Sequence, residues 1–248
     1  MSFAQNSDLP KVSIITVTLN AEKYIERCIN TVLSQSYPNI EHVILDGNSK
    51  DNTPAILKRY TNKIAFWKSE LDNGVYNAMN KAVTYATGDW ILFIGADDIL
   101  FPGFSEMAYK LKDENTIYYG NHKWRNSFNG QKFDSYQLTK ENVCHQSIFY
   151  PRAVFDKYQY NEKYRSRADH VLNMQCWGDN RFRKRYYPIV ISDYSEGGFS
   201  AQNRDFLYYE DKPYLIRKHL GVICFLRYKY RCYKNKKRGI DIDNDLLY

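Results

Sequence analysis

The chain has 248 residues, which is enough for one large domain or two small ones with a sizeable buried core. A hydrophobic content of 44%, a charged content of 25% and a net charge of +7 are compatible with a globular protein, and five cysteines without CxxC or zinc-finger spacing indicate reduced thiols rather than disulfides. Residues 1–11 lack the pattern of a signal peptide, and the apolar run at 220–226 is far shorter than the roughly 20 residues that span a bilayer. We therefore expect a cytoplasmic protein.

The first hundred residues alternate between short apolar runs rich in β-branched residues and segments with helical spacing. The runs predict strands at 12–19, 42–47, 64–70 and 90–95, and the spacing predicts helices at 24–33, 49–60 and 75–86. Strands that alternate with helices at this distance are joined by right-handed crossovers. The sequence therefore predicts an α/β fold with a doubly wound, mostly parallel sheet.

The second half is less regular. We expect a hairpin with an Asn-Gly turn at 127–133, strands at 143–150 and 186–194, and a helix at 168–179. No linker rich in glycine or proline separates this half from the first. We interpret it as an extension of the same domain.

The positive charge is concentrated near the C-terminus. Residues 212–238 hold ten Lys and Arg and no Asp or Glu, which leaves 25 basic and 28 acidic residues elsewhere. Bulky apolar and aromatic residues alternate with these cations, as they do in helices that lie in a membrane interface. A structural helix with a basic face and a nucleic-acid contact are the alternatives. We expect basic amphipathic helices at the inner leaflet and no nucleic-acid partner.

Polar residues follow each predicted strand of the first half. Because the carboxyl ends of parallel strands share one edge of a sheet, these residues are expected to converge on one crevice. Neither the GxGxxG fingerprint nor the GxxxxGK[ST] loop is present, so side chains would have to hold any nucleotide. The residues singled out are Thr18, Asn20, Asp46, Asp72, Asp97 and Asp98.

Asp97 and Asp98 stand directly behind the apolar run at 90–94. Adjacent like charges repel unless a cation joins them, and Mg²⁺ or Mn²⁺ prefers one or two carboxylates together with a phosphate. The alternative is a plain turn that leads through Pro102 and Gly103 into a helix.

Four motifs in this order resemble glycosyltransferase family 2, and most of all its bacterial members that build capsule, exopolysaccharide and O-antigen. They are "TVTLN", "DGNSKDNT", "SELDNGVYNAMNKA" and "ATGDWILFIGADD". The resemblance is strong over residues 11–105 and weaker in "CHQSIFY", "YRSRADHVL" and "SEGGFS". It implies a GT-A fold at 1–211, with a nucleotide-sugar half at 11–105, an acceptor half at 106–211 and a basic aromatic tail at 212–248.

The resemblance also implies an activity, which is inverting transfer of a sugar from a nucleoside diphosphate donor with a divalent cation. It places Thr18 and Asn20 near the nucleoside, gives Asp46 the hydrogen bond to the base and puts Asp72 near the donor. The family resemblance makes Asp97 the metal ligand, for Mn²⁺ or Mg²⁺, with Asp98 beside it. Gly95 departs from the family pattern, because an aspartate often occupies that position.

Asp169, in "RAD", stands where the family keeps its catalytic base. An inverting transfer needs one carboxylate to take the proton of the acceptor hydroxyl, while a cation stabilises the leaving diphosphate. The alternative is that Asp169 caps the helix that follows it.

Two further features keep two interpretations each. His145 and Gln146 could bind the acceptor or a donor phosphate, or form a buried hydrogen-bonded pair. The loop with Gly197, Gly198 and Ser200 could lie near the diphosphate or be a plain turn.

We therefore expect an inverting glycosyltransferase of surface polysaccharide synthesis, with a nucleotide-sugar donor of the UDP class and a glycan or lipid-linked acceptor. An inactive nucleotide-sugar-binding module, suggested by Gly95, is the first alternative. A nucleic-acid-binding protein that acts through the basic tail is the second.

Overall fold

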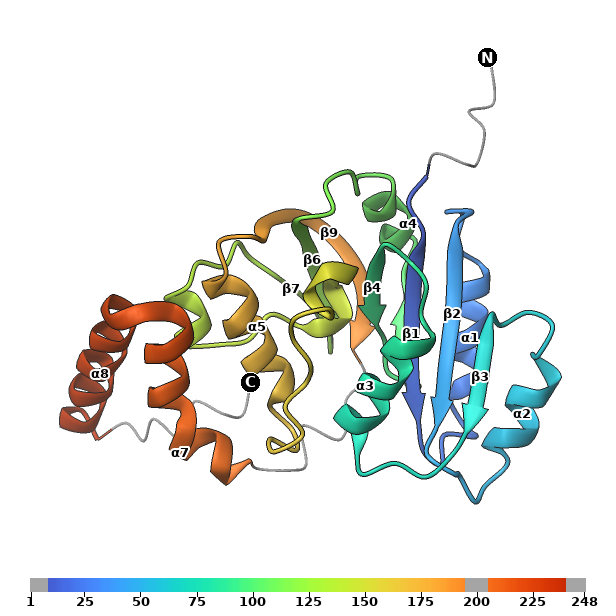
Figure 1. Cartoon of the computed structure of the whole chain (residues 1–248), viewed down its shortest axis with the longest axis horizontal. Helices are drawn as coiled ribbons and strands as arrows, with labels where there is room; N and C mark the ends of the chain where they lie inside the picture. The colour runs from blue at the N-terminus through green and yellow to red at the C-terminus, as the bar shows by residue number, and fades with distance from the viewer. Residues whose placement is uncertain (1–8, 195–204, 240–248) are drawn as a thin grey trace, which may run out of the picture.

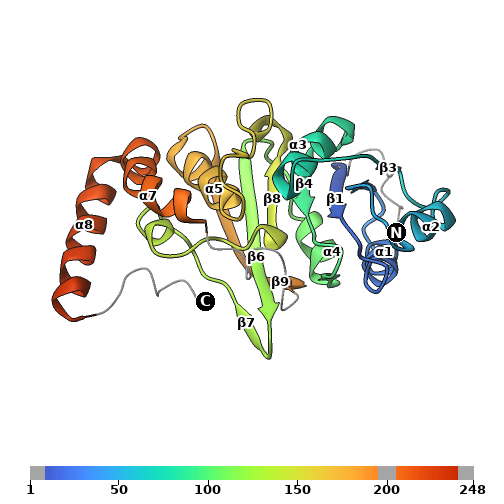
Figure 2. The same ribbon diagram turned by 90° about the horizontal axis from the view of Figure 1, so that it is seen from below.

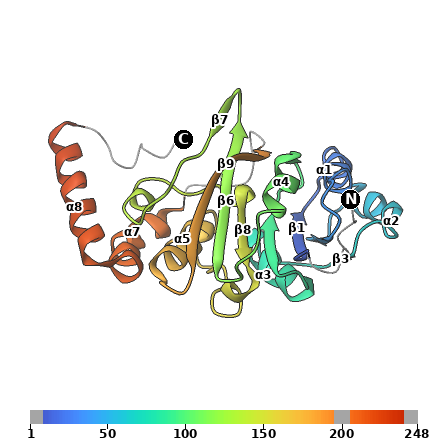
Figure 3. The same cartoon turned by 90° about the horizontal axis from the view of Figure 1, so that it is seen from above.

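A computed structural model describes residues 9–194 and 205–239 of the chain. Figure 1 shows a central sheet with the N-terminal strands at one end of the molecule and the C-terminal helices at the other. The views in Figure 2 and Figure 3 keep this arrangement, with the strands of the second half between the two ends.

The alternation predicted for the first half is confirmed, and each element begins and ends within a few residues of its expected bounds. Burial of both faces explains the nearly continuous apolar character of the strands at 12–18, 40–46 and 90–93. The elements are β1 (Val12–Thr18), α1 (Ile25–Leu33), β2 (Ile40–Asp46), α2 (Thr53–Arg59), β3 (Phe66–Ser69), α3 (Val75–Tyr85) and β4 (Trp90–Phe93).

The second half adds further strands, helices and single helical turns. The predicted helix and the last predicted strand are present as α5 and β9. The elements are β5 (Ile99–Leu100), α4 (Gly103–Ala108), β6 (Thr116–Trp124), β7 (Ser127–Asn129), the turns η2 (Gln137–Thr139) and η3 (His145–Ser147), β8 (Ile148–Pro151), the turn η4 (Arg152–Val154), α5 (Ala168–Gly178), β9 (Arg183–Tyr194), α7 (Phe206–Leu215), the π-helical turn η5 (Ile216–Leu220) and α8 (Gly221–Lys237).

Within residues 9–194 and 205–239, nine strands form one sheet in the order β3-β2-β1-β4-β8-β6-β9-β5, with β7 paired to β6. The pairs β3–β2, β2–β1 and β1–β4 are all parallel, as predicted, whereas β8 runs antiparallel to β4 and to β6. The order reverses at β1, because β2 and β4 lie on its two sides. In parallel α/β sheets this switch point is where ligands bind, outside the carboxyl ends of the strands.

The two faces of the sheet bury alternate residues of each strand. Ile15 of β1 and Phe93 of β4 pack with α3 and α5 in one cluster, whereas Ile14 and Leu92 pack with α1 and α4 in another. Helix α2 joins α1 over Ile44 of β2. Helices therefore cover both faces, which is the doubly wound architecture.

Two details of the second half differ from the prediction. The hairpin turn is Arg125-Asn126, because Trp124 pairs with Ser127 and Arg125 has a φ of 55°. The Asn-Gly pair therefore lies at the end of β7, where Asn129 pairs with His122 of β6, and does not form the turn. The strand expected at 143–150 begins only at Ile148, since the three residues before it form the turn η3.

The C-terminal helices pack on the same core as the rest of the domain. His170 of α5 lies 2.7 Å from the Tyr208 hydroxyl of α7, and Leu215, Ile216 and Tyr228 are buried in the cluster that contains α5. The C-terminus of α5 approaches η5 so closely that a Cβ on Gly178 would lie 1.8 Å from the His219 carbonyl oxygen. The boundary expected at residue 211 falls inside α7.

Candidate active site

Side chains from the loops after β1, β2 and β3 meet at the carboxyl edge of the sheet. Asp46, the last residue of β2, is fully buried and accepts hydrogen bonds from the Ser49 amide at 3.0 Å and the Ser69 hydroxyl at 2.5 Å. The Ser49 hydroxyl bonds the same carboxylate. Asp46 therefore holds the loop that follows β2 against the end of β3.

Asn20, in the loop after β1, also holds the loop that follows β2. Its backbone lies in the left-handed region at a φ of 51°, its amide donates to Ser49 Oγ at 2.7 Å, and its side-chain oxygen accepts from the Lys50 amide at 2.9 Å. Asparagine tolerates this conformation better than most residues do. The loops after β1 and β2 are therefore one hydrogen-bonded unit.

Thr18 and Asp72 lie at the margins of this unit. Thr18 pairs with Asp46 across the two parallel strands, and its buried hydroxyl has no hydrogen-bond partner among the described residues. Asp72 accepts from the Gly74 amide at 2.8 Å, and a Cβ on Gly47 would lie 2.5 Å from Asp72 Oδ2. The structure thus brings together four of the six residues predicted to bind the donor, and a side chain at position 47 would collide with the Asp72 carboxylate.

Asp97 and Asp98 each direct a carboxylate oxygen to the space that a Cβ of Gly95 would occupy. A Cβ on Gly95 would lie 2.7 Å from Asp98 Oδ2 and 2.9 Å from Asp97 Oδ1. Asp98 is almost fully buried and accepts from the Gly95 amide at 2.8 Å, whereas Asp97 is half-buried and its carboxylate accepts no hydrogen bond within the described ranges. The missing side chain at position 95 is what lets the two carboxylates converge.

Two side chains of helix α1 hydrogen-bond the backbone of this loop. Arg27 donates to the Asp97 carbonyl oxygen at 2.6 Å, and the Cys28 thiol lies 3.4 Å from the Gly95 carbonyl oxygen. Burial, and next the charge of Asp98, raise the pKa of Cys28 to about 12, so the thiol stays a protonated donor. Hydrogen bonds from α1 therefore hold the backbone carbonyl groups of Gly95 and Asp97.

Asp169 lies in the first turn of α5 with its side chain 14% exposed. It accepts from the Tyr76 hydroxyl at 3.0 Å and from Asn142 Nδ2 at 2.7 Å, and His145 Nδ1 lies 3.4 Å away. Burial alone would raise the pKa of Asp169, but the hydrogen bond and charge of His145, together with the charge of Arg167, hold it below its ordinary value. The group is therefore a carboxylate at neutral pH.

The helix-cap interpretation of Asp169 is wrong. The cap position of α5 is Arg167, no side chain makes a capping hydrogen bond there, and the Asp169 carboxylate is bonded to side chains from α3 and from the segment before η3. Sequence reasoning missed Tyr76 and Asn142. The helical spacing of Tyr76 identified only its buried position, and nothing in the sequence marked Asn142.

The turn η3 connects the two carboxylate sites through consecutive residues. Gln146 Nε2 donates to Asp98 Oδ2 at 3.1 Å, and His145 faces Asp169. Gln146 is buried and its oxygen accepts from the Cys144 thiol at 3.0 Å. The two residues are therefore a bridge between Asp98 and Asp169. Gly197, Gly198 and Ser200 lie outside the described residues.

The site offers oxygen donors for a divalent cation but no complete cage. Among the residues that the structure describes, no three His, Cys, Asp or Glu side chains gather as a metal site. The unbonded Asp97 carboxylate and the adjacent Asp98 Oδ2 are the kind of donor pair to which a diphosphate could add the remaining ligands. These residues fit a cation that is completed by its substrate.

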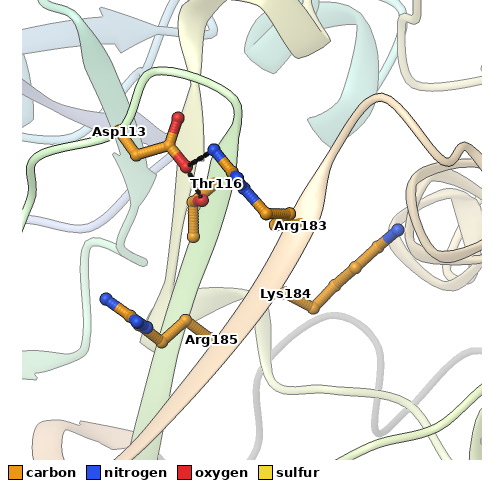
Figure 4. Close-up of a pocket in the computed structure, with 5 residues that line it drawn as sticks. All are labelled: Asp113, Thr116, Arg183, Lys184 and Arg185. Atoms are coloured by element: carbon orange, nitrogen blue, oxygen red, sulfur yellow. Dashed lines mark hydrogen bonds and ion pairs between the residues drawn. The ribbon is translucent and has the colours of Figure 1, made fainter.

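A hollow of about 450 Å³ lies elsewhere, at the amino ends of β6 and β9 (Figure 4). Because β6 runs in the same direction as β4, these amino ends are at the edge opposite the candidate site. Arg183 is bonded to Asp113 there, and Asp113 also accepts from Thr116. The residues that line the hollow are Asp113, Thr116, Arg183, Lys184 and Arg185.

Comparison with known proteins gives a consistent assignment. The sequence profile described as Glycosyl transferase family 2 matches residues 13–187. A "PGL/p-HBAD biosynthesis glycosyltransferase" of Mycobacterium tuberculosis is 33% identical over 233 residues, which cover 88% of this chain and 90% of that protein. The Escherichia coli enzyme WfgD, a "UDP-Glc:alpha-D-GlcNAc-diphosphoundecaprenol beta-1,3-glucosyltransferase", is 36% identical over 45% of this chain and 46% of its own.

Solved structures share the fold. S. aureus TarS in complex with UDP-GlcNAc superposes with a TM-score of 0.69 at 22% identity, over 84% of this chain and 66% of that chain. The mannosyltransferase PcManGT of Pyrobaculum calidifontis, in complex with GDP-Man and Mn²⁺, gives a TM-score of 0.63 at 14% identity, over 98% of this chain and 86% of its own. The GT-A fold expected from the motifs is confirmed.

Proposed function

The chain belongs to glycosyl transferase family 2 and is a glycosyltransferase related to enzymes of surface polysaccharide synthesis, and from that premise we propose a specific reaction. The enzyme transfers a sugar, with inversion, from a nucleoside diphosphate donor of the UDP class to a hydroxyl of a glycan or lipid-linked acceptor.

One observation carries the proposal, and it is the pair of carboxylate sites joined by η3. Asp98 is bonded to Gln146, and Asp169 faces the neighbouring His145. An inverting transfer needs a base on the acceptor side of the sugar and charge stabilisation on the leaving-group side. The short turn provides a fixed spacing between two such groups.

Asp169 is the base in this proposal. Its low pKa keeps it ionised, and the hydrogen bonds from Tyr76 and Asn142 fix the orientation of the carboxylate. It takes the proton of the acceptor hydroxyl as that oxygen attacks the anomeric carbon, and the bond from this carbon to the nucleoside diphosphate breaks on the opposite face. His145 stabilises the anionic form before the transfer.

Thr18, Asn20, Asp46 and Asp72 form the donor end of the crevice. The unpartnered Thr18 hydroxyl can hydrogen-bond a nucleoside, whereas Asn20 and Asp46 shape the loops around it. Three similar proteins support a nucleotide-sugar donor: TarS is in complex with UDP-GlcNAc, WfgD is named for UDP-Glc, and PcManGT is in complex with GDP-Man. We assign the UDP class because two of these three donors are uridine nucleotides.

Mn²⁺ or Mg²⁺ fits at Asp97, with Asp98 beside it. When bound, such an ion would neutralise the charge of the departing diphosphate. PcManGT, whose structure contains Mn²⁺, shares the fold. Asp97 supplies the free carboxylate for this ion, and Arg27 and Gln146 hold the two aspartates in place.

The proposed location is the inner face of the membrane, on the cytoplasmic side, where a lipid-linked acceptor is presented. In the described ranges, no helix has the length and apolar character needed to cross a bilayer. Support for a peripheral contact comes from the charge of residues 212–238.

The test compares Asp169→Asn, Asp97→Asn and the control Asp113→Asn, which changes an aspartate at the opposite edge of the sheet. Release of nucleotide from UDP-glucose, UDP-GlcNAc and GDP-mannose is measured with and without Mn²⁺, and nucleotide affinity is measured by calorimetry. Asp169→Asn should lose about 10²–10⁴-fold in kcat with nucleotide affinity kept. Asp97→Asn should lose the metal-dependent part of that affinity, and the control should match the unmodified enzyme.

Full activity in both site variants would refute the assignment of these residues. Tight, metal-dependent nucleotide binding by the unmodified chain without turnover of any donor would instead favour the inactive binding module. The configuration of the product, read by NMR, tests inversion separately.

A further inference from the structure

Helix α8 has two faces that differ sharply in burial. One face packs on the body of the protein through residues that are buried or half-buried. The opposite face carries large apolar side chains that are between 55% and 76% exposed. The inner residues are Cys224, Phe225, Tyr228, Arg231, Cys232 and Asn235, and the outer apolar residues are Val222, Ile223, Leu226, Tyr230 and Tyr233.

The outer apolar residues form one stripe along the helix. Ile223, Leu226, Tyr230 and Tyr233 recur at intervals of three and four residues, which places them on one side of a helix that turns by about 100° per residue. On the same projection the stripe is centred nearly opposite Tyr228, the most buried residue of α8. The stripe therefore points directly away from the protein, and α8 lies at the end of the molecule farthest from β1–β3 in all three views (Figures 1, 2 and 3).

Cations border the stripe on both sides. Arg227 and Lys234 lie on one flank, Lys229 and Lys236 lie on the other, and all four are exposed. Lys234 Nζ lies 5.6 Å from the centre of the Tyr230 ring, so a cation and an aromatic face meet at the border of the stripe. The segment 212–238 contains no acidic residue.

We propose that the outer face of α8 is a docking surface for an anionic phospholipid bilayer, with the helix lying in the plane of the interface. The stripe would enter the boundary between headgroups and acyl chains, and the flanking cations would meet lipid phosphates. Tyrosine suits this depth because it has an apolar ring and a polar end.

The charge pattern selects this partner over the other candidates. Two copies of α8 that met through their stripes would bring lysine and arginine rows together without an acidic residue to offset them. Nucleic acid would satisfy the cations but leave the aliphatic stripe in water. Only an anionic lipid surface matches both the stripe and its borders.

The inference does not depend on the proposed reaction, because its test reads binding and needs no donor or acceptor. The full chain is sedimented with vesicles of phosphatidylcholine alone, and with vesicles that also contain phosphatidylglycerol, at low and high salt. Ile223→Gln is compared with Phe128→Gln, which removes an apolar side chain of β7 that is 67% exposed, against 76% for Ile223. The triple variant Lys229→Gln, Lys234→Gln, Lys236→Gln is compared with Lys23→Gln, Lys58→Gln, Lys132→Gln, which removes the same charge from other exposed positions.

The unmodified chain should bind the vesicles that contain phosphatidylglycerol, and high salt should weaken that binding. The α8 lysine variant should lose about 100-fold in partition, because each basic residue near an anionic surface contributes about a fivefold factor. Ile223→Gln should lose about tenfold, since an apolar side chain no longer leaves water. Both control variants and Asp169→Asn should bind like the unmodified chain.

Four results would overturn the inference. The first is that the α8 variants bind vesicles as well as their controls do, and the second is that the unmodified chain binds vesicles equally with and without phosphatidylglycerol. A dimer that Ile223→Gln dissociates, without vesicle binding, would assign the stripe to a second copy. Vesicle binding that appears only after removal of residues 240–248, which carry three aspartates, would mean that the C-terminus of the chain itself occupies the stripe.

Discussion

Replacement of Gly95 by alanine tests whether the missing side chain is what assembles the site. The added Cβ would lie 2.7 Å from Asp98 Oδ2 and 2.9 Å from Asp97 Oδ1, closer than real Cβ contacts. The carboxylate oxygens would have to retreat by about 0.6–0.8 Å to reach an ordinary contact of about 3.5 Å. Asp98 cannot retreat freely, because it is buried and bonded to the Gly95 amide and to Gln146.

Two quantities follow from this geometry. Overpacking at a buried position costs about 1–3 kcal/mol of folding stability. A displacement approaching 1 Å in a catalytic group lowers the rate by about 10²-fold. We therefore expect Gly95→Ala to fold with a lower thermal midpoint, to lose metal-dependent nucleotide binding and to lose most of its kcat/KM. Gly95→Asp should be worse still, since it adds a third negative charge.

Gly221→Ala is the matched control, because it separates a loss of stability from damage to the site. Gly221 has a φ of 89° between η5 and α8, and a Cβ there would contact nothing within 4 Å. The substitution strains the backbone by about 1 kcal/mol without touching the carboxylates. Nucleotide affinity is measured for both variants by calorimetric titration, and kcat/KM by steady-state kinetics. A Gly95→Ala enzyme as active as Gly221→Ala would refute the reasoning.

Two further predictions concern buried hydrogen bonds to carboxylates. Tyr76→Phe removes a hydrogen bond to Asp169, so the pKa of the base should rise and the acid limb of the kcat/KM profile should move up by about one pH unit. Tyr160→Phe removes a buried hydroxyl that has no hydrogen-bond partner in the described part of the chain, and it should leave that limb in place. Burial would raise the pKa of Glu41, but its hydrogen bonds hold it at about 2, so its stabilising effect is present above the ordinary value of 4.5 and is lost as the pH falls through 2. Glu41→Gln should therefore lower the free energy of unfolding by about 3 kcal/mol at neutral pH, and should make that free energy depend less on pH between 4.5 and 2. Glu106→Gln, at an exposed position, is the control and should do neither. Equal unfolding curves for the two variants would contradict this prediction.

Local pattern was sufficient to predict the strands and helices of the first half. Val12–Thr18 and Trp90–Phe93 are buried on both faces, so their apolar character is visible without knowledge of any neighbour. The polar residues behind them were predictable for the same reason, since parallel strands must end at one edge.

Contacts between distant segments could not be predicted in this way. The bond from Tyr76 to Asp169 joins residues 93 positions apart, and only the packing of α3 against α5 creates it. The hairpin turn at Arg125 was missed because pairing of β6 with β7 overrode the preference of the Asn-Gly dipeptide. The sequence also left open which face of α8 meets the body, because both faces carry aromatic residues.

The close packing of Gly178 against His219 limits how this chain can be divided. Helix α5 carries Asp169 in its first turn and rests on η5 at its last residue, so the C-terminal helices complete the support of that helix. A deletion or recombination breakpoint between 206 and 237 would uncover aromatic and aliphatic residues that belong to the common core. A hybrid protein could therefore inherit the sugar-transferring half of this chain only together with the helices that follow it.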